Sequence, residues 1–449
     1  MEEIKENKMA STPMLKLIIS MSLPSMFSML IQALYNVVDS MYVAYSSQAA
    51  LTAVSLAFPV QMLMIAVSVG TGIGINSLVS RRLGEKRFAE ANSAATHGVL
   101  IAIASWLLFV VLGILFIQPY FSMLDASAEV KQMAITYTNI VIFVSIGCFL
   151  EVNLEKTLQA TGNMIYPMLF QLVGAVTNII LDPIFIFGYL GVPAMGIAGA
   201  AIATVAGQIV AMIFAIIIIF TKSHDVHITF KKFKINWTTI KDIYVVGVPS
   251  IVMQAIGSVL TTALNWILIG FSEAAVSVFG IYFKLQSFIF MPVFGLTHGV
   301  MPIMGYSFGA RKKQRLVSAL KYGCVIAVII MAVGMLIFMI IPDKLLMMFN
   351  ATDEILRIGV PALRTISLCF VSAAIGIIFS TLFQALGLGF NSLLVSLLRQ
   401  IIILLPAAYF LSKISLDAVW YAFVIAEVVS LIASILIYWG VYKTRIRNL

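Results

Sequence analysis

The sequence predicts an all-α polytopic membrane protein with twelve transmembrane helices. Of its 449 residues, 61% are hydrophobic and only 10% are charged, whereas a soluble domain carries about 25% charged residues. The mean hydropathy is +1.05, and many apolar runs reach the roughly 20 residues that a helix needs to cross a bilayer. The net charge of +9 does not indicate nucleic-acid binding, because the basic residues gather in loops.

The apolar runs follow one another with short connections. Several are longer than a span requires, which predicts tilted helices or helices that project past the membrane. All three cysteines lie inside the runs, which is typical of inert buried thiols. The expected spans are 15–45, 51–80, 93–118, 129–153, 158–188, 192–220, 241–270, 275–307, 316–341, 354–382, 385–411 and 417–442.

Basic residues are divided unequally between the two sides of the membrane. With the N-terminus inside, the inner segments carry 21 of the 28 Lys and Arg residues and the outer segments carry five. Cytoplasmic loops of membrane proteins are enriched in Lys and Arg, so we expect both termini in the cytoplasm. The inner group is Lys5, Lys8, Lys16, Arg81, Arg82, Lys86, Arg87, Lys156, Lys222, Lys231, Lys232, Lys234, Lys241, Arg311, Lys312, Lys313, Arg315, Lys321, Lys443, Arg445 and Arg447.

The chain also repeats itself at a constant offset of 225 residues. Both copies of the repeat cross the membrane in the same inside-to-outside sense, which predicts two pseudo-symmetric six-helix lobes around a central cavity. Rocking of one lobe against the other would give alternating access. We expect an N-terminal lobe over 1–220, a cytoplasmic linker over 221–242 and a C-terminal lobe over 243–449. The matched residues are Pro24 and Pro249, Gly70 and Gly295, Gly74 and Gly299, Gly84 and Gly309, Gly98 and Gly323, Gln159 and Gln384, and Gly162 and Gly387.

The first apolar run carries a polar face. Gln32, Tyr35, Asn36 and Asp39 are spaced at i, i+3, i+4 and i+7, so they share one side of a helix. A carboxylate within a bilayer is costly and commonly marks an ion or substrate path. Pro24, earlier in the same run, removes a backbone hydrogen bond and predicts a kink.

The fifth run carries a second acidic residue near its outer end. Asn178 and Asp182 are spaced at i and i+4, and Asp182 is expected at a depth similar to that of Asp39. Tyr137 in the fourth run and Thr204 in the sixth are expected near the same depth. Their oxygens can coordinate Na⁺, and the two carboxylates can instead take up a proton. The sequence leaves both choices open.

The two acidic residues Asp39 and Asp182 have no acidic counterparts in the C-terminal lobe. At the repeat offset, Asp39 corresponds to Leu264 and Asp182 corresponds to Ala407. A purely architectural role would be expected in both lobes.

Other charged residues lie within or near the expected spans. Lys284, Arg399 and Glu427 are in the C-terminal lobe, where a buried ion pair and a role in contacting substrate are equally compatible with the sequence. Glu155 is expected to form an interfacial ion pair with Lys156. The 24 methionines and 30 phenylalanines weakly favour binding of lipophilic, cationic molecules.

Several motifs together resemble the multidrug and toxic compound extrusion (MATE) family. The resemblance covers essentially the whole chain and is strongest at Asn178-Ile179-Ile180-Leu181-Asp182-Pro183. The other motifs are Ser22-Leu23-Pro24, Leu34-Tyr35-Asn36-Val37-Val38-Asp39, Arg81-Arg82-Leu83-Gly84 and Gln159-Ala160-Thr161-Gly162.

The resemblance is closest to the prokaryotic DinF-like branch. It implies that Asp39, Asn178, Asp182 and Thr204 bind the coupling cation or proton, with Tyr137 nearby and Pro24 as the hinge. Gln32, Tyr35, Asn36, Lys284, Arg399 and Glu427 are candidates for the substrate cavity. The NorM-like branch places acidic residues in the C-terminal lobe, and this chain has only Glu427 deep in that lobe.

The function implied is export of amphipathic, cationic drugs, and hence antibiotic resistance, in exchange for H⁺ or Na⁺. We expect no cofactor, no resident metal and no enzymatic activity, since no nucleotide-hydrolysing motif is present and an ion gradient must drive transport. The protein is expected to work as a monomer in a prokaryotic inner membrane, in contact with membrane lipids. The alternative is a flippase for a lipid-linked oligosaccharide or lipid, which would need cationic groups in its cavity.

Overall fold

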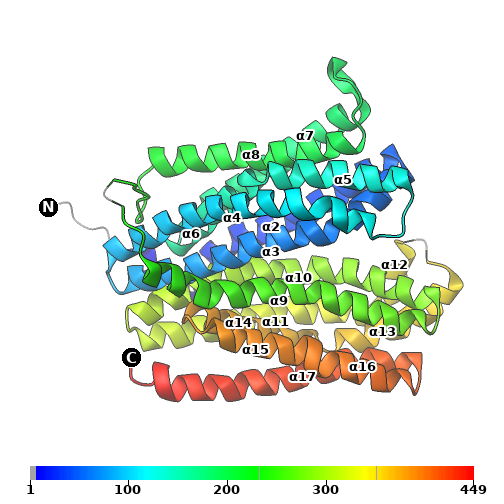
Figure 1. The fold of residues 1–449 in the computed structure, drawn as a ribbon. Helices are drawn as coiled ribbons and strands as arrows, with labels where there is room; N and C mark the ends of the chain where they lie inside the picture. The colour runs from blue at the N-terminus through cyan, green and yellow to red at the C-terminus, as the bar shows by residue number, and fades with distance from the viewer. Residues whose placement is uncertain (1–6, 232, 350) are drawn as a thin grey trace.

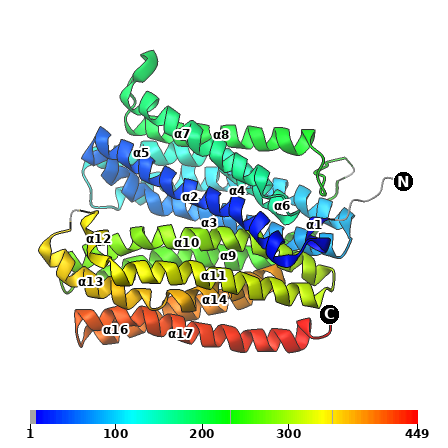
Figure 2. The ribbon, with the colours of Figure 1, turned by 180° about the vertical axis from the view of Figure 1, so that it is seen from behind.

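The computed structural model describes residues 7–231, 233–349 and 351–449. Its long helices lie roughly side by side, with those of the first half of the chain above those of the second half in Figure 1. The short helix α1 and the C-terminus lie at the same end of the helices, as the view from behind shows (Figure 2). We call this the basic end, because Arg81–Arg87, Arg311–Arg315 and Lys443–Arg447 lie there. Lys5 and Lys232 lie outside the described residues.

The described part of the first half, from residue 7 on, contains nine helical elements. They are α1 (Lys8–Ser11), α2 (Met14–Ser46), α3 (Gln48–Gly84), α4 (Phe88–Ser122), α5 (Ala128–Phe143), α6 (Ile146–Ala160), α7 (Ile165–Phe187), the short 3₁₀ turn Tyr189–Gly191, and α8 (Ile197–Thr221).

The second half begins after the connection 222–236. It contains α9 (Trp237–Ile269), α10 (Glu273–Gly309), α11 (Lys313–Ile340), α12 (Pro342–Met347), α13 (Asp353–Ser367), α14 (Phe370–Ala385), α15 (Gly389–Leu397), a π-helix (Leu398–Leu404), α16 (Leu405–Ser412), α17 (Leu416–Val441) and a second π-helix (Tyr442–Ile446).

The prediction of an all-helical polytopic protein is confirmed. Ten helices of the described chain are long and apolar enough to cross a membrane, and the count rises to 12 when each of two bent helix pairs is one span. The pairs are α5 with α6, bent by 46°, and α13 with α14, bent by 47°.

Two predicted boundaries were wrong. The fourth span does not end at residue 153, because α6 continues to Ala160, and the fifth begins at Ile165 instead of 158. The turn between them lies at Gly162, whose φ of 89° favours glycine. The charges of Glu155 and Lys156 suggested that the fourth span ends before them, but both side chains are buried inside the helix bundle.

Repeat-related serines begin two of the longest helices. The hydroxyl of Ser47 accepts a hydrogen bond from the backbone N–H of Ala50 at 3.0 Å, and Ser272 does the same for Ala275 at 3.1 Å. Each serine satisfies one of the free N–H groups of a helix N-terminus. The two halves therefore use the same local chemistry at equivalent positions.

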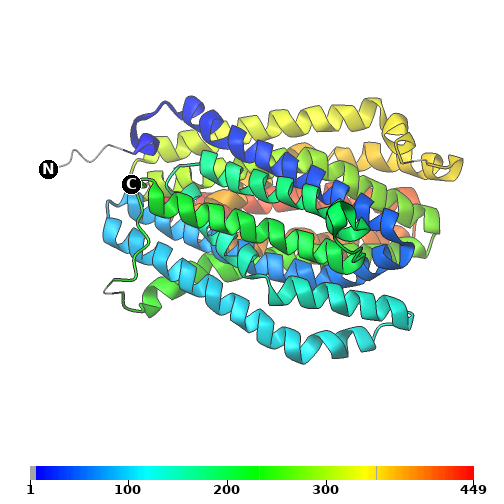
Figure 3. The ribbon, with the colours of Figure 1, turned by 90° about the horizontal axis from the view of Figure 1, so that it is seen from above.

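Repeat-related glycines bring the two halves into backbone contact near the basic end. A Cβ added to Gly70 would lie 2.7 Å from the backbone nitrogen of Ile251, and one added to Gly295 would lie 2.6 Å from that of Met26. A Cβ added to Gly74 would lie 2.2 Å from the carbonyl oxygen of Ile243 on α9, and one added to Gly299 would lie 2.9 Å from the backbone nitrogen of Ser22 on α2. The absence of side chains at these positions lets α3 pack closely on α9 and α10 on α2. The view from above in Figure 3 shows the long helices of the first half running lengthwise over those of the second half.

The opposite half of α9 and α10 is less tightly covered. A Cβ added to Gly257 or Gly280 would meet no atom within 4 Å. On α2, Leu34 and Met41 in the same half are 58% and 49% exposed. The close glycine-mediated contacts between the halves thus lie toward the basic end.

Candidate functional site

Asp39 and Asp182 form a pair of carboxyl groups in the first half of the chain. Asp39 lies seven residues before the end of α2, and Asp182 lies five residues before the end of α7. Their side chains lie within hydrogen-bonding reach of each other. Asp182 is fully buried, and Asp39 is half-buried. Two negative charges so close in a low-dielectric interior repel each other, which favours uptake of a proton or a cation between them.

Hydroxyl and amide groups from other helices surround this pair. Tyr35 of α2 and Tyr137 of α5 both face the two carboxyl groups and the hydroxyl of Thr204 on α8. The amide of Asn178 donates a long hydrogen bond of 3.5 Å to Thr204 Oγ1. The structure therefore brings the predicted coupling residues of four helices together at one level of the molecule.

Several oxygens of the site have no hydrogen-bond donor among the described residues. They are Asp39 Oδ1, Asn178 Oδ1, and both carboxylate oxygens of Asp182. A buried acceptor without a donor costs about 1–3 kcal/mol. A proton bound to one carboxyl group would supply a donor to one neighbouring oxygen, and a small hard cation such as Na⁺ could be coordinated by several of these oxygens at once. The oxygen ligands of the site therefore fit either ion.

Gln61 of α3 is a member of the site that the sequence interpretation missed. Its side chain lies within hydrogen-bonding reach of the Tyr137 hydroxyl. A polar amide within an apolar run could have marked it, but nothing in the sequence pairs Gln61 with Tyr137, which lies on another helix.

The other polar residues of the first helix are more open. Gln32 and Asn36 are exposed, whereas Tyr35 on the same helix is half-buried against the carboxyl pair. Lys284 of α10 is also exposed, and its ammonium group lies 5.9 Å from the centroid of the Phe349 ring. No described contact joins Lys284 to the carboxyl pair.

Arg399 and Glu427 form an ion pair in the second half of the chain. The Arg399 guanidinium lies 3.4 Å from a carboxylate oxygen of Glu427, and the two side chains are 26% and 14% exposed. Arg399 belongs to the π-helix Leu398–Leu404, which packs against α17. The sequence is compatible with an ion pair of Glu427 with either Arg399 or Lys284, and the structure shows the pair with Arg399.

A second polar network lies deeper toward the basic end of the first half. The expected ion pair of Glu155 with Lys156 is present at 3.1 Å, but it is not interfacial as expected, because the side chains are buried in the helix bundle and only 3% and 4% exposed. Gln159 and Gln171 donate hydrogen bonds of 2.6 and 2.9 Å to the two carboxylate oxygens of Glu155. These partners from α6 and α7 allow the charges to be buried.

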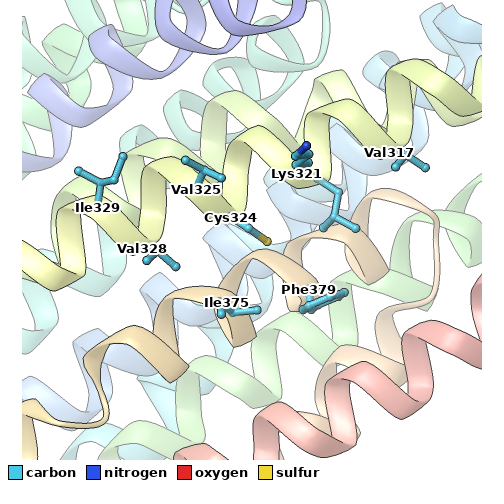
Figure 4. Close-up of a pocket in the computed structure, with 9 residues that line it drawn as sticks. Val317, Lys321, Cys324, Val325, Val328, Ile329, Ile375 and Phe379 are labelled. Atoms are coloured by element: carbon cyan, nitrogen blue, oxygen red, sulfur yellow. The ribbon is translucent and has the colours of Figure 1, made fainter.

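A groove on the second half has a different character. It lies between α11 and α14 and is lined by apolar side chains together with Lys321 (Figure 4). Val325 and Ile329 on its rim are 47% and 57% exposed. This outer apolar surface suits contact with lipid and lies on the other half of the chain from Asp39 and Asp182.

Comparison with known proteins identifies the family. A sequence profile described as MatE matches residues 24–184 and matches again over residues 249–410. The chain belongs to the MATE family. The two MATE matches begin 225 residues apart, at Pro24 and Pro249, in agreement with the internal repeat.

Relatives extend over almost the whole chain. The multidrug export protein MepA of Staphylococcus aureus is 25% identical over 428 residues, which cover 95% of this chain and 94% of MepA. MepA of Staphylococcus haemolyticus is 25% identical over 416 residues, covering 92% of this chain and 91% of that protein. This MATE protein is therefore a homologue of a multidrug exporter, a transporter and not an enzyme.

Solved MATE structures share the fold. One described as the outward-facing conformation of a multidrug resistance MATE transporter has a TM-score of 0.92 and 28% identity, covering 100% of this chain and 99% of the other. A transporter of the same superfamily from Pyrococcus furiosus has a TM-score of 0.92 and 27% identity, with 99% of each chain covered. The fold is thus that of an ion-coupled MATE antiporter.

Proposed function

We propose that this protein exports amphipathic, cationic drugs across a prokaryotic cell membrane in exchange for H⁺ or Na⁺. The observation that carries the proposal is the close approach of the Asp39 and Asp182 side chains inside the helix bundle. Their oxygens without a hydrogen-bond donor can bind one of these ions. The names of the relatives, multidrug export proteins, support drugs as the cargo. Confinement of the acidic pair to the first half supports a place in the DinF-like branch.

In the proposed orientation the basic end faces the cytoplasm, as the distribution of Lys and Arg favours. The close contacts of Gly70, Gly74, Gly295 and Gly299 would then seal the cytoplasmic side. The structure would correspond to an outward-facing state, in line with its likeness to an outward-facing relative.

The coupling follows from competition between cation and drug. A proton or Na⁺ entering from outside would cancel one negative charge of the pair Asp39 and Asp182, and the electrostatic attraction of the pair for a cationic drug would weaken. Cation and drug then bind at each other's expense, which is what an antiporter requires. Pro24 lies inside α2, the helix that carries Asp39, and is placed to let that helix bend.

A flippase for lipid-linked oligosaccharides is less well supported. It would need free cationic groups to hold a pyrophosphate, and Arg399 is already paired with Glu427. That leaves the exposed Lys284 as the one cation, among the candidates named from the sequence, without a carboxylate partner in the described chain. One such group is a poor match for a doubly charged ligand.

The test is dye efflux from proteoliposomes with imposed H⁺ and Na⁺ gradients, applied separately. We expect one gradient to drive efflux, and the variants Asp39→Asn and Asp182→Asn to abolish it while keeping the folded, monodisperse protein. Asp125→Asn is the matched control, because Asp125 is an exposed carboxylate in the loop between α4 and α5. Normal gradient-driven efflux by Asp39→Asn would exclude the proposed mechanism.

A further inference from the structure

Polar side chains continue from the carboxyl pair toward the basic end, inside the first half of the molecule. On α7, Gln171 lies seven residues before Asn178, which is two helical turns or about 10 Å. On α8, Gln208 lies one turn after Thr204. The side-chain oxygens Asn178 Oδ1, Gln171 Oε1 and Gln208 Oε1 are all shielded from solvent and have no donor among the described residues.

Glu151 belongs to α6, which packs against both α7 and α8. Its Oε1 is also shielded and has no donor in the described part of the chain. Gly147, one turn before Glu151, packs against the backbone of Gln208. Glu155, one turn after Glu151, accepts a hydrogen bond from Gln171 at 2.9 Å. Along α6, Glu151 therefore lies between the position that packs on Gln208 and Glu155, which bonds to Gln171.

The charged and titratable groups around Glu151 come from two helices. On its own helix they are Cys148, Glu155 and Lys156. The second helix is α10 of the other half, where His298 lies near Lys156. The elements α7 and α8 contribute the neutral amides Gln171 and Gln208. The neighbouring cation Lys156 is already held by Glu155, so Glu151 has no ion-pair partner of its own in the described chain.

We propose that Glu151 is the inner proton acceptor of the transport cycle, receiving the proton from Asp39 and Asp182 and releasing it toward the basic end. The proposal rests on the antiport function above and assigns H⁺ as the coupling ion. In each cycle an aspartic acid loses H⁺, the Glu151 carboxylate gains it as a carboxylic acid, and that acid then gives it to cytoplasmic water. The only bonds formed or broken are O–H bonds, and nothing is oxidised or reduced.

The geometry beyond Glu151 favours a proton over a metal cation. The side chains of Glu155, Lys156, Gln159 and Gln171 are joined by direct contacts of 2.6–3.1 Å. A sodium ion with its ligands would have to break these contacts to pass. A proton needs only acceptors that can bind and release it, and the buried amide oxygens can hold water molecules that carry it.

The experiment uses the full-length protein in liposomes that contain a pH-sensitive dye and a fluorescent cationic substrate. Proton entry and substrate efflux are followed together, and substrate–substrate exchange at equal pH is measured separately. For Glu151→Gln we expect proton-coupled efflux to fall on the order of 100-fold, the loss typical of a missing proton acceptor. Substrate affinity and exchange at equal pH should remain close to wild type. Glu151→Asp should recover much of the rate.

Two further variants make the result decisive. Glu129→Gln is the control, since Glu129 is exposed in the first turn of α5. Gln208→Leu should slow proton-coupled efflux while keeping Glu151, and it decides the matter if Glu151→Gln does not fold. Wild-type rates for Glu151→Gln, or for Gln208→Leu in that case, would overturn the proposal. If the wild-type protein moves substrate on a Na⁺ gradient without proton entry, the proton acceptor is excluded while the antiport function stands.

Discussion

Gly84 of α3 and Gly309 of α10 each lie against the backbone of the other helix at the basic end. A Cβ on Gly84 would be 2.1 Å from the carbonyl oxygen of Tyr306, and a Cβ on Gly309 would be 2.1 Å from that of Arg81. The two contacts are related by the internal repeat, since both glycines and both carbonyls are 225 residues apart. No side chain can be accommodated there unless the helices separate.

The first prediction concerns this contact. Gly84→Ala should shift the protein away from the state closed at the basic end, because an added methyl group forces the two backbones apart at a cost of about 1–3 kcal/mol. Distances between spin labels on Arg87 and Arg311, measured by pulsed electron paramagnetic resonance, should lengthen. Gly376→Ala is the control, since a Cβ there meets no atom within 4 Å. Unchanged distances in Gly84→Ala would contradict the role of the glycine contact.

The second prediction concerns an ion pair across the same interface. Arg82 lies 3.4 Å from Asp242, but it also contacts Glu85 at 2.8 Å and Glu90 at 3.1 Å in its own half. Asp242→Asn should change the free energy of the closed state by less than about 1 kcal/mol, because an ion pair that keeps contact with solvent contributes little and is screened by salt. The same spin-label distances at low and high salt check this. A shift larger than that of Gly84→Ala would show that charge, and not close packing, holds the end closed.

The third prediction concerns the hydroxyl at the centre of the coupling site. Thr204→Val keeps the shape of the side chain but removes the group that Asn178, Tyr35 and Tyr137 share. Loss of such a partner costs about 1–3 kcal/mol, so the cation concentration for half-maximal drug release should rise by roughly 5- to 150-fold. The control is Thr177→Val, because the Thr177 hydroxyl donates to the carbonyl of Val173 on its own helix and has no other hydrogen bond among the described residues. Equal half-maximal concentrations in both variants would remove Thr204 from the site.

Much of this architecture can be predicted from the sequence, because the physics of the bilayer acts on each segment separately. A span needs a long apolar run, and a residue such as Asp39 inside one is costly wherever it lies. The pairing of Asp39 with Asp182 also follows from depth, since both lie a few residues before the same ends of parallel helices. The Gln61 contact could not be derived, because it depends on how α3 rotates against α5.

The two helix breaks could not be predicted for a similar reason. Neither Val144-Ser145 nor Leu368-Cys369 contains proline or glycine. At the first break the Trp106 indole donates to the Phe143 carbonyl at 3.0 Å, and the Ser145 hydroxyl donates to that of Ile142 at 2.7 Å. These groups satisfy carbonyls that the bend exposes, and Trp106 comes from another helix. Only the assembled fold supplies that partner.

The fourth prediction separates the two roles open to Arg399 and Glu427. If the pair is structural, Arg399→Met leaves the Glu427 carboxylate without its partner and should cost about 2–3 kcal/mol, less than the ~3–5 kcal/mol of a fully buried pair because both ends keep some solvent contact. The double variant Arg399→Met with Glu427→Met should regain most of the thermal stability, since two apolar side chains leave no unpaired charge.

Drug affinity provides the second readout for this pair. If the pair is structural, drug affinity should stay constant in the double variant and in every single variant that folds. If Glu427 contacts a cationic drug directly, every variant that lacks Glu427 should bind the drug more weakly. Lys284→Met is the control for loss of a cation, because Lys284 is exposed and should unfold at the wild-type temperature. Melting curves in detergent, followed by equilibrium binding of a fluorescent drug, give both measurements. If the double variant is no more stable than Arg399→Met, the instability of Arg399→Met does not come from an unpaired Glu427 carboxylate, and the structural role of the pair is excluded.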